Sequence, residues 1–491
     1  MFKHDLFDVL IFSLTTGFLP LSFHKAVITL IPKKGDIHDI SNWRPVSLLN
    51  TDYKIFAKLL ANRLKQHIGN VIHLDQTYCI PNRTIYDNLN LIRDIIHFSN
   101  SSNSPLAVVN LDQKKAFDNV DHGYLFSTMR AMGFGNNFLT YLRLLYSGAE
   151  SHIKVCGGLT APFPFQKGIR QGCPLSGLLY SIAIEPFLHN LRKQLDQCSF
   201  TIPNSGKVCS VSAYADDISI FVTSDVGFDI NRIYNLYSRS SAASLNYTKS
   251  QGLWAGPWIG RSDKPLNFQW NDQGLRFLGV HLGNYNHYVK QNWTNCSEKL
   301  NRTLSRWTPL SSSLSLKGKV LIANQLAATQ VFHSLAVLCP PEDILSGLQR
   351  RLVDFVLSGK RHLLEKEKLF QPCNHGGLGL ACLRARSLTF KFALIQRFHQ
   401  HNPHPCYLLM DYNLRLYKRL DLSHQLFLLD LEPKFFTSVP CFYGEVLRAW
   451  VTSGARMNTS LFSVNDILEI PMIYAPLVES FPGGPAFCAR L

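Results

Sequence analysis

Apolar and polar positions in the first half of the chain follow patterns that predict both strands and helices. Residues 23–32 and 106–112 are short runs rich in apolar and β-branched side chains, which predict strands. Residues 208–222 contain two such runs that meet at an Ala-Asp-Asp sequence, which predicts a β-hairpin with acids at its tip. Residues 53–68 carry apolar side chains at helical spacing and basic ones on the other faces, so they predict an amphipathic helix.

The remaining patterns predict an α+β protein whose second part is mainly helical. Further helices are expected at 121–146, 173–195 and 228–245. Segments that contain strands are expected at 151–165 and 275–283. After about residue 285 helical spacing continues, in segments such as 290–307, 316–338 and 343–357, while strand signals fade. Residues 401–491 give only weak signals.

Composition restricts the partners and the cellular compartment. The 491 residues are enough for more than one structural unit. The net charge of +16 favours polyanionic partners, either nucleic acid or an anionic membrane surface. No apolar run reaches the roughly 18 residues of a membrane span, so we expect no membrane partner. The 12 cysteines lack metal-ligand spacing, which fits a reducing intracellular compartment, nucleus or cytoplasm.

Three acids are placed where a sheet could bring them together. Asp112 ends one predicted strand, and Asp216 and Asp217 occupy the predicted hairpin tip. Carboxylates that converge at a sheet edge repel each other unless cations neutralise them. Two Mg²⁺ ions, with Mn²⁺ as an alternative, would suit such oxygen ligands and could assist phosphoryl transfer. The alternative is an ordinary Asp-Asp turn on a solvated hairpin.

Six ordered motifs closely resemble the reverse transcriptases of LINE-type, non-LTR retrotransposons. They are AVITLIPKKGD with NWRPVSLLN (26–50), LDQKKAFDNVD (111–121), KGIRQGCPLSGLLYSIAIEPF (167–187), AYADD (213–217), LNYTKS (245–250) and RFLGVHLG (276–283). The resemblance runs from about residue 8 to 285 and continues more weakly to about 400. The six motifs occur in the order and at the spacing seen in that family, which makes chance similarity negligible.

The resemblance implies a right-hand polymerase. Its fingers and palm, an antiparallel sheet flanked by helices, would occupy residues 8–285. A helical thumb or connection would occupy 286–400, and the role of 401–491 stays open. The implied activity is RNA-directed addition of deoxynucleoside triphosphates to a DNA primer 3′-hydroxyl on an RNA template. The oligomeric state is not indicated.

The resemblance also assigns roles to individual residues near the acids. Asp112, Asp216 and Asp217 would bind metal, with Asp217 holding it less directly. Phe117 would be a steric gate whose ring occupies the space of a ribose 2′-hydroxyl, although composition alone favours an ordinary core phenylalanine. Gln171 and Gly172 would contact the incoming nucleotide and template base. Their alternative is a plain loop-to-helix connection.

Basic residues and one tyrosine complete the expected site. By resemblance, Arg44 and either Lys33 or Lys34 would contact the triphosphate, with Arg44 the better suited because a guanidinium binds phosphate in a bidentate way. Lys249 would protonate the pyrophosphate leaving group, and Tyr214 would contact substrate. The lysines could equally be solvated surface residues.

The chain also departs from the family pattern. Residues 277–279 (Phe-Leu-Gly) resemble a primer-grip strand, but no endonuclease domain and no CCHC zinc knuckle are found. We therefore expect a piece of a longer reading frame. One alternative function is a catalytically silent remnant that at most binds nucleic acid. Another is an RNA-dependent RNA polymerase, against which Phe117 argues.

Overall fold

The computed structural model describes residues 2–456 except 34, 156, 226–228, 360–364 and 401. The chain divides into two compact units. The first unit comprises Met1–Asn88, Phe98–Thr201 and Val208–Asp272. The second unit comprises Leu89–His97, Ile202–Lys207 and Gln273–Leu491.

A mixed five-stranded sheet forms the centre of the first unit, in the order β12-β11-β3-β10-β9. Its strands are β3 (Leu106–Leu111), β9 (Val211–Tyr214), β10 (Asp217–Val222), β11 (Gln251–Ala255) and β12 (Gln269–Asn271). The central strand β3 pairs antiparallel with both β10 and β11, and five of its six residues are buried. This explains why its sequence is an apolar run and not an alternating one.

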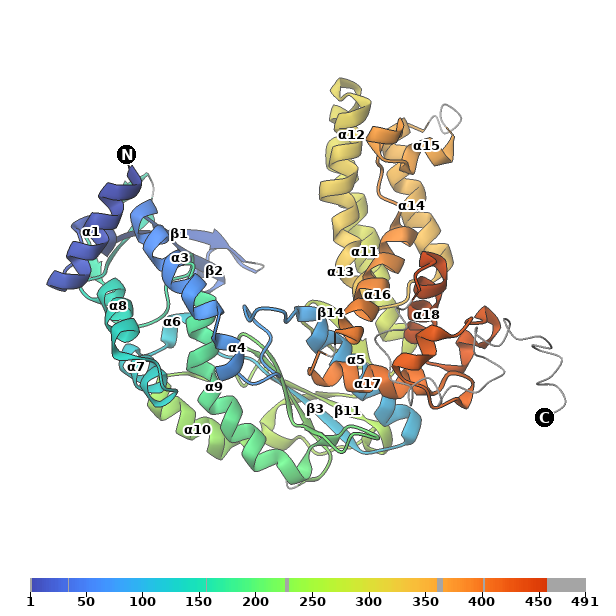
Figure 1. The fold of residues 1–491 in the computed structure, drawn as a ribbon, viewed down its shortest axis with the longest axis horizontal. Helices are drawn as coiled ribbons and strands as arrows, with labels where there is room; N and C mark the ends of the chain where they lie inside the picture. The colour runs from blue at the N-terminus through green and yellow to red at the C-terminus, as the bar shows by residue number, and fades with distance from the viewer. Residues whose placement is uncertain are drawn as a thin grey trace, which may run out of the picture. The chain divides into compact units, whose positions relative to one another are not determined.

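Helices cover this sheet and supply most of the core of the first unit. One of them, α9 (Ser176–Leu195), packs against β9, and α10 (Ile230–Ser241) packs beside α9 (Figure 1). The others are α1 (Phe2–Thr16), α2 (Leu21–His24), α3 (Thr51–Lys65), α4 (Ile68–Val71), α5 (Ile85–Ser102, which also contributes to the second unit), α6 (Ala116–Asn119), α7 (His122–Ala131) and α8 (Asn136–Tyr146).

A second five-stranded sheet in the first unit follows the order β2-β1-β4-β5, with β6 also paired to β4. Its strands are β1 (Lys25–Pro32), β2 (Trp43–Leu49), β4 (Glu150–Val155), β5 (Gly158–Leu159) and β6 (Phe163–Pro164). The pair β7 (Phe200–Thr201) and β8 (Val208–Cys209) is separate. The sheets are mixed, because β1 runs parallel to β4 and β11 parallel to β12, so the expected purely antiparallel arrangement is incomplete.

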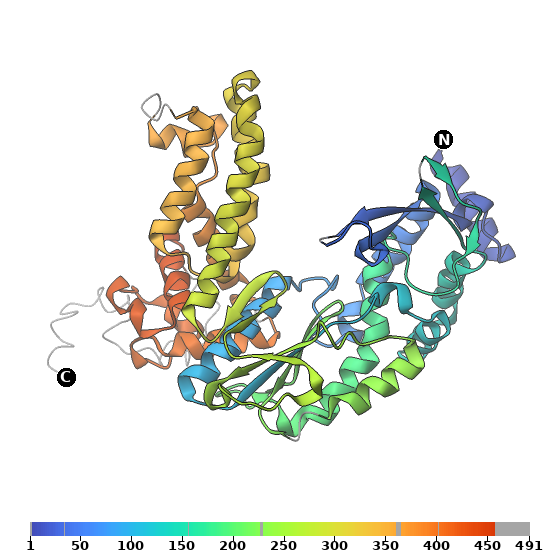
Figure 2. The same ribbon diagram turned by 180° about the vertical axis from the view of Figure 1, so that it is seen from behind.

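The second unit is mainly helical, as its sequence pattern predicts. After the hairpin of β13 (Gly274–Phe277) and β14 (Val280–Gly283), the long helices α11, α13, α14 and α16 pack against one another (Figure 2). The helices are α11 (Asn286–Trp307), α12 (Leu316–Ile322), α13 (Thr329–Val337), α14 (Glu342–Leu357), α15 (Lys366–Phe370), α16 (Leu383–His399), α17 (Pro405–Arg415) and α18 (Cys441–Ser453).

Two sequence predictions need correction in detail. The segment 121–146 is two helices and not one, because Gly133 adopts a left-handed φ of +84° between them. The expectation that no stretch is long and apolar enough for a membrane span was wrong for Leu316–Val337, a 22-residue helix that contains an 18-residue window with a mean hydropathy of 1.3. This helix, joined by a π-helical turn, has 56% of that window buried, and a core helix satisfies the same criterion.

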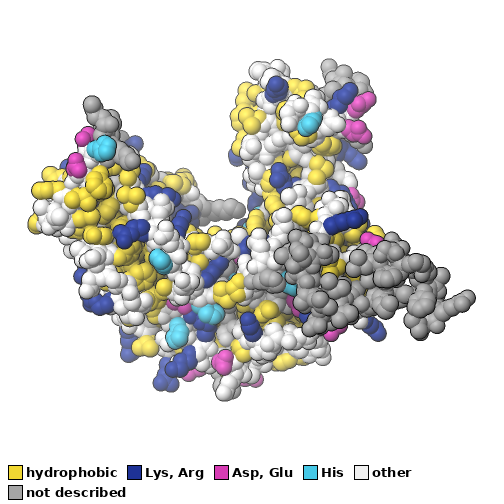
Figure 3. All heavy atoms as spheres, viewed as in Figure 1, with side chains coloured by type: hydrophobic (Ala, Val, Ile, Leu, Met, Phe, Trp, Pro, Cys, Tyr) yellow, Lys and Arg dark blue, Asp and Glu magenta, His cyan; other side chains and the backbone are white. Residues whose placement is uncertain are grey.

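Apolar side chains are also exposed on the N-terminal helices of the first unit. Figure 3 shows hydrophobic side chains gathered over α1. The exposed members of this surface are Phe7, Ile11, Phe12, Phe18 and Leu21. Such a patch is unusual for surface helices, which normally direct their apolar residues inward.

Candidate active site

The register of the central sheet brings the three acids to one edge. The last pair of the β3–β10 ladder is Leu111 opposite Ile218. Asp112, which follows β3, and Asp217, which is the first residue of β10, therefore lie at the same end of the sheet. Asp216 is the neighbour of Asp217 in the hairpin turn between β9 and β10. Strand pairing therefore brings Asp112 beside two acids that lie 104 and 105 positions away in sequence.

The hairpin turn is shaped by a buried glutamine that sequence reasoning missed. Ala215 has a left-handed φ of +57°, which is uncommon for a residue with a Cβ. The fully buried Gln76 holds it: the Ala215 amide donates to Gln76 Oε1 (3.1 Å), and Gln76 Nε2 donates to the Ala215 carbonyl (3.3 Å). Both backbone groups of the residue before the acid pair are thus satisfied.

Asp112 is held by a second loop, formed by residues 245–250. Asn246 Nδ2 donates to Asp112 Oδ2 at 2.9 Å, and the Asn246 amide donates to the Asp112 carbonyl at 2.8 Å. The Asp112 amide donates to Ser250 Oγ at 3.1 Å. These bonds fix the side chain and backbone of Asp112, so the LNYTKS motif acts first as a clamp on this acid.

Crowding and like charge both affect protonation of the acids. Desolvation, and then the charges of Asp216 and Asp112, raise the pKa of Asp217 to about 6 although its surface is exposed. Desolvation and the charge of Asp112 also raise the pKa of Asp216. The mutual effect means that the three carboxylates lie close enough to repel one another.

Two cations from the β1–β2 hairpin act on Asp216. The positive charges of Arg44 and Lys33 partly offset the increase in the Asp216 pKa. Arg44 lies opposite Ile31 in the β1–β2 ladder, and Lys33 directly follows β1, and both are exposed. Both residues therefore lie near enough to Asp216, from a separate sheet, for their charges to act on it. Lys34 lies outside the described residues.

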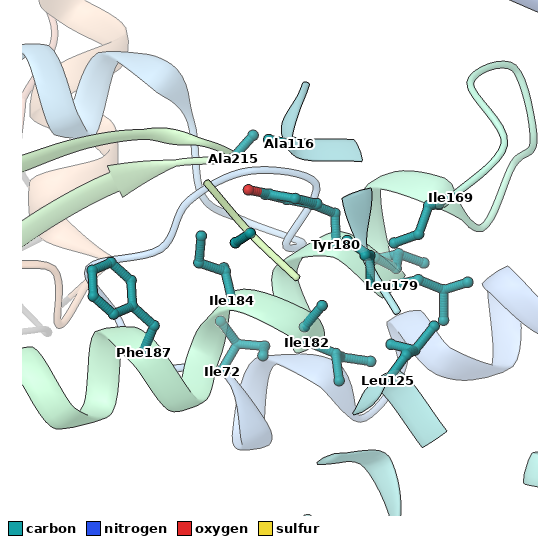
Figure 4. Close-up of a cluster of buried hydrophobic side chains, with 14 of the residues drawn as sticks. Ile72, Ala116, Leu125, Ile169, Leu179, Tyr180, Ile182, Ile184, Phe187 and Ala215 are labelled. Atoms are coloured by element: carbon teal, nitrogen blue, oxygen red, sulfur yellow. The ribbon is translucent and has the colours of Figure 1, made fainter. Parts of the chain in front are cut away.

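Phe117 lies in an aromatic cluster next to the acids. Its ring stacks on Tyr180 of α9, with centroids 4.3 Å apart and planes 18° apart, and it meets Tyr78 edge-on at 6.3 Å. Figure 4 shows the Tyr180 ring lying between α9 and the hairpin turn at Ala215. Phe117 is half-buried, so one part of it packs in the core while another part remains accessible.

The loop before α9 is attached to the helix that carries Phe117. The Ile169 amide donates to the Phe117 carbonyl (2.7 Å), and Gln171 Nε2 donates to Asp118 Oδ1 (3.1 Å). Gly172 has a φ of +113°, and a Cβ there would lie 2.6 Å from the Ser47 carbonyl oxygen. The glycine is therefore required by backbone conformation and by close approach.

The remaining predicted residues lie in different surroundings. Tyr214 ends β9, and its ring packs edge-on against Tyr78 at 5.1 Å. Lys249 is exposed in the loop that clamps Asp112, and no ion pair joins it to the described acids. Leu278, of the expected primer grip, belongs to the second unit, where its carbonyl contacts His333 Nε2 at 3.0 Å.

The side-chain chemistry of the acids suits a divalent cation, but their positions are not yet those of a formed metal site. Among the described residues, no three His, Cys, Asp or Glu side chains are grouped closely enough to hold a metal ion as they stand. The donor set consists of carboxylate oxygens, which are the ligands that Mg²⁺ prefers. Desolvation, and after it mutual repulsion, raise the pKa values of Asp216 and Asp217, and a bound cation would relieve the repulsion.

Sequence reasoning named the acids but missed their supports. Gln76, Asn246, Tyr180 and Asp118 each contact a predicted site residue or its turn. Asp118, Asn246 and Tyr180 lie within the motifs given above, so membership of those motifs was an available signal. Gln76 had none, because nothing near it in sequence marks a chemical site.

Comparison with known proteins gives the family. Residues 31–282, just over half of the chain, match the model of the family described as reverse transcriptase (RNA-dependent DNA polymerase). The "Transposon TX1 uncharacterized 149 kDa protein" of Xenopus laevis is 40% identical over 484 residues, which are 96% of this chain and 36% of that protein. The "RNA-directed DNA polymerase from mobile element jockey" of Drosophila melanogaster is 28% identical over 231 residues, covering 44% of this chain and 23% of that protein.

Two further comparisons accompany these. The Pol polyprotein of the type-2 retrotransposable element R2DM of Drosophila melanogaster is 26% identical, over 44% of this chain and 20% of that protein. The structure of telomerase from Candida tropicalis with a fragment of telomeric RNA is similar over 76% of this chain and 62% of its own, with a TM-score of 0.44 and 13% identity. The matched part of the chain spans about a third of the Xenopus protein and less than a quarter of each of the two Drosophila proteins. The chain belongs to the reverse transcriptase (RNA-dependent DNA polymerase) family, in the group of non-LTR retrotransposons.

Proposed function

We propose that this chain is an RNA-directed DNA polymerase that adds deoxynucleotides to a primer 3′-hydroxyl. The observation that carries the proposal is the strand register, in which Asp112 follows β3 and Asp217 begins the neighbouring β10 at the same end of the sheet, with Asp216 beside them. Family membership supports the reaction type, and the net charge of +16 supports a nucleic-acid template and primer.

The acids would hold the divalent cations that this reaction requires. Asp112 and Asp216 are proposed as direct ligands and Asp217 as a less direct one. When bound, such cations supply the positive charge that favours deprotonation of the primer hydroxyl and departure of pyrophosphate. Asn246 keeps Asp112 oriented through its 2.9 Å hydrogen bond, and Gln76 keeps the hairpin turn in its left-handed conformation.

The surrounding residues would bind the nucleotide. Arg44 and Lys33, whose charges act on Asp216, are proposed to contact the triphosphate. Phe117 is proposed to exclude the ribose 2′-hydroxyl, since its ring is held against Tyr180 and is still partly exposed. Gly172 and Gln171 are proposed to bring the loop backbone close to the base pair that is being formed.

Primer extension tests the proposal. The purified chain would be incubated with an RNA template, a DNA primer, deoxynucleotides and Mg²⁺. We expect the parent to extend the primer and Asp216→Asn to be at least a hundred-fold slower. Replacing the carboxylate by a neutral amide removes a negative charge and so weakens stabilisation of the transition state by several kcal/mol, about 1.4 kcal/mol for each factor of ten in rate. Asp196→Asn is the matched control, because Asp196 is an exposed acid at the end of α9.

The outcomes separate the alternatives. Extension by the parent and by Asp196→Asn, but not by Asp216→Asn, supports the proposal. If the parent binds the primer–template without extending it, the chain is a nucleic-acid-binding remnant. Equal rates for all three proteins would show that the acid edge is not the catalytic site.

A further inference from the structure

Two cysteines that are distant in sequence meet in the second unit. Cys339 follows α13, and Cys441 is the first residue of α18. Both line a cavity of about 90 Å³, and each thiol shifts the pKa of the other. Cys441 is exposed and Cys339 is half-buried, and both are free thiols. The shared cavity therefore brings together an accessible cysteine and a more protected one.

Two cations, the buried Lys391 and the half-buried Arg93, hold the two segments together independently of the cysteines. The fully buried Lys391 donates from Nζ to the Leu338 carbonyl (3.0 Å), and its Nζ lies 5.5 Å from the centroid of the Phe442 ring. Arg93 donates to the Val337 carbonyl (2.7 Å) and lies 3.5 Å from the same ring centroid. Each cation thus contacts Val337 or Leu338, just before Cys339, and also Phe442, just after Cys441. These contacts hold the two cysteine-bearing segments next to each other.

The surroundings make the two thiols chemically different. The hydrogen bond from Cys339, followed by the charges of Lys391 and Arg448, lowers the pKa of Cys441 to about 6, against burial and the charge of Glu445. The same hydrogen bond and burial raise the pKa of Cys339. A thiolate that is exposed at the start of a 13-residue helix is the form that attacks electrophilic sulfur.

We propose that Cys339 and Cys441 form a reversible redox site that reacts with small disulfides of the glutathione class. Cys441 thiolate attacks one sulfur of the small disulfide, its S–S bond breaks, and one small thiolate leaves. Cys339, after losing its proton to solvent, attacks the Cys441 sulfur of the mixed disulfide, and the second small thiolate leaves. The protein dithiol is oxidised to a disulfide and one small disulfide is reduced to two thiols.

The product would join the end of α13 to the start of α18. It would close a loop of about one hundred residues, and long loops are those in which a cross-link most restricts the unfolded chain. We expect the thermal unfolding midpoint of the second unit to rise on oxidation and to return to its starting value when dithiothreitol is added. Oxidation would thus stabilise this part of the helical unit against unfolding.

Reaction with oxidised glutathione tests the site. The parent, Cys339→Ser and Cys441→Ser would be treated at pH 6, alkylated and digested, and the peptides identified by mass spectrometry. We expect the parent to form the Cys339–Cys441 cross-link and retain no glutathione there, whereas Cys339→Ser retains one glutathione on Cys441. Cys373→Ser is the control, because Cys373 is exposed and lies outside the pair, and it should form the cross-link as the parent does.

A rate measurement in the parent does not depend on whether the variants fold. At pH 6 the larger thiolate fraction of Cys441, offset by its lower intrinsic nucleophilicity, predicts a reaction with oxidised glutathione about ten-fold faster than at Cys373. Cys79, which is also exposed, gives a second reference. A Cys441 rate no higher than those of the references overturns the proposal. Retention of glutathione on Cys441 of the parent, without cross-linking, overturns it equally.

Discussion

Replacing Gly172 with alanine measures how much the loop before α9 depends on its close contact with β2. The φ of Gly172 is +113°. This lies well outside the conformations favoured by residues with a Cβ, and such strain costs about 1–3 kcal/mol. The new Cβ would lie 2.6 Å from the Ser47 carbonyl oxygen, so the backbone must also move.

The movement would break a specific hydrogen bond. The Ser47 amide donates to the Gln171 carbonyl at 2.7 Å, and such a bond contributes about 1 kcal/mol. Together with the strain, we expect Gly172→Ala to lower the free energy of unfolding by about 2–4 kcal/mol. Gly133→Ala is the matched control, because its φ of +84° also disfavours alanine while no atom lies within 4 Å of the new Cβ. It should cost about 1–2 kcal/mol.

Hydrogen exchange and primer extension provide the measurements. The amide of Ser47 should exchange at least five-fold faster in Gly172→Ala, consistent with loss of about 1 kcal/mol of local protection, and at the parental rate in Gly133→Ala. Extension should slow in Gly172→Ala, because the loop carries Gln171 and is attached to the helix of Phe117. If both alanine variants show equal stability losses and the Ser47 amide exchanges at the parental rate, the close-approach argument is wrong.

Three further predictions concern single side chains. Phe117→Ala should reduce discrimination against ribonucleotides at least ten-fold in primer extension, while Phe117→Tyr should retain it; unchanged discrimination would exclude a gate role. The pKa of Asp217 is raised, so its ionisation between about pH 4 and pH 6 disfavours the folded state. With a chelator present to remove divalent cations, Asp217→Asn should therefore unfold at a higher urea concentration than the parent at pH 7 but not below pH 4. A difference between the two proteins that stays the same at both pH values would contradict this. Burial lowers the pKa of Lys391 to about 8 from 10.5. Between these two pH values the unfolded chain binds more protons than the folded one. From pH 8 to 10.5 the unfolding free energy of the parent should therefore rise by up to about 3 kcal/mol relative to that of Lys391→Met. Parallel pH curves for the two proteins would refute the lowered pKa of Lys391.

Local patterns predicted several elements of the first unit correctly. The apolar run of β3, the hairpin of β9 and β10, and the amphipathic helix α3 lie where the sequence indicates, with ends shifted by a few residues. These patterns depend on neighbouring positions, and burial of one face makes them visible in sequence. The breaks are less visible: the helix expected at 121–146 is interrupted at Gly133, whose effect depends on the backbone conformation that packing selects.

The contacts that arrange the candidate site depend on the whole fold. Gln76 meets Ala215 across 139 positions, and Asn246 meets Asp112 across 134. Neither glutamine nor asparagine differs in type from many surface amides, so no local pattern distinguishes these two. The stacking of Phe117 on Tyr180 and the contact of Cys339 with Cys441 are likewise set by packing of separate helices and loops.

By itself, the sequence determined the identity and order of the motifs, the strands that end in acids and the helical character of the second part. Only the tertiary structure decided which side chains support those acids and which distant thiols meet. The physical reason is that hydrophobic periodicity is a property of nearby residues, whereas strand register and helix packing are decided by the combined burial of the entire core.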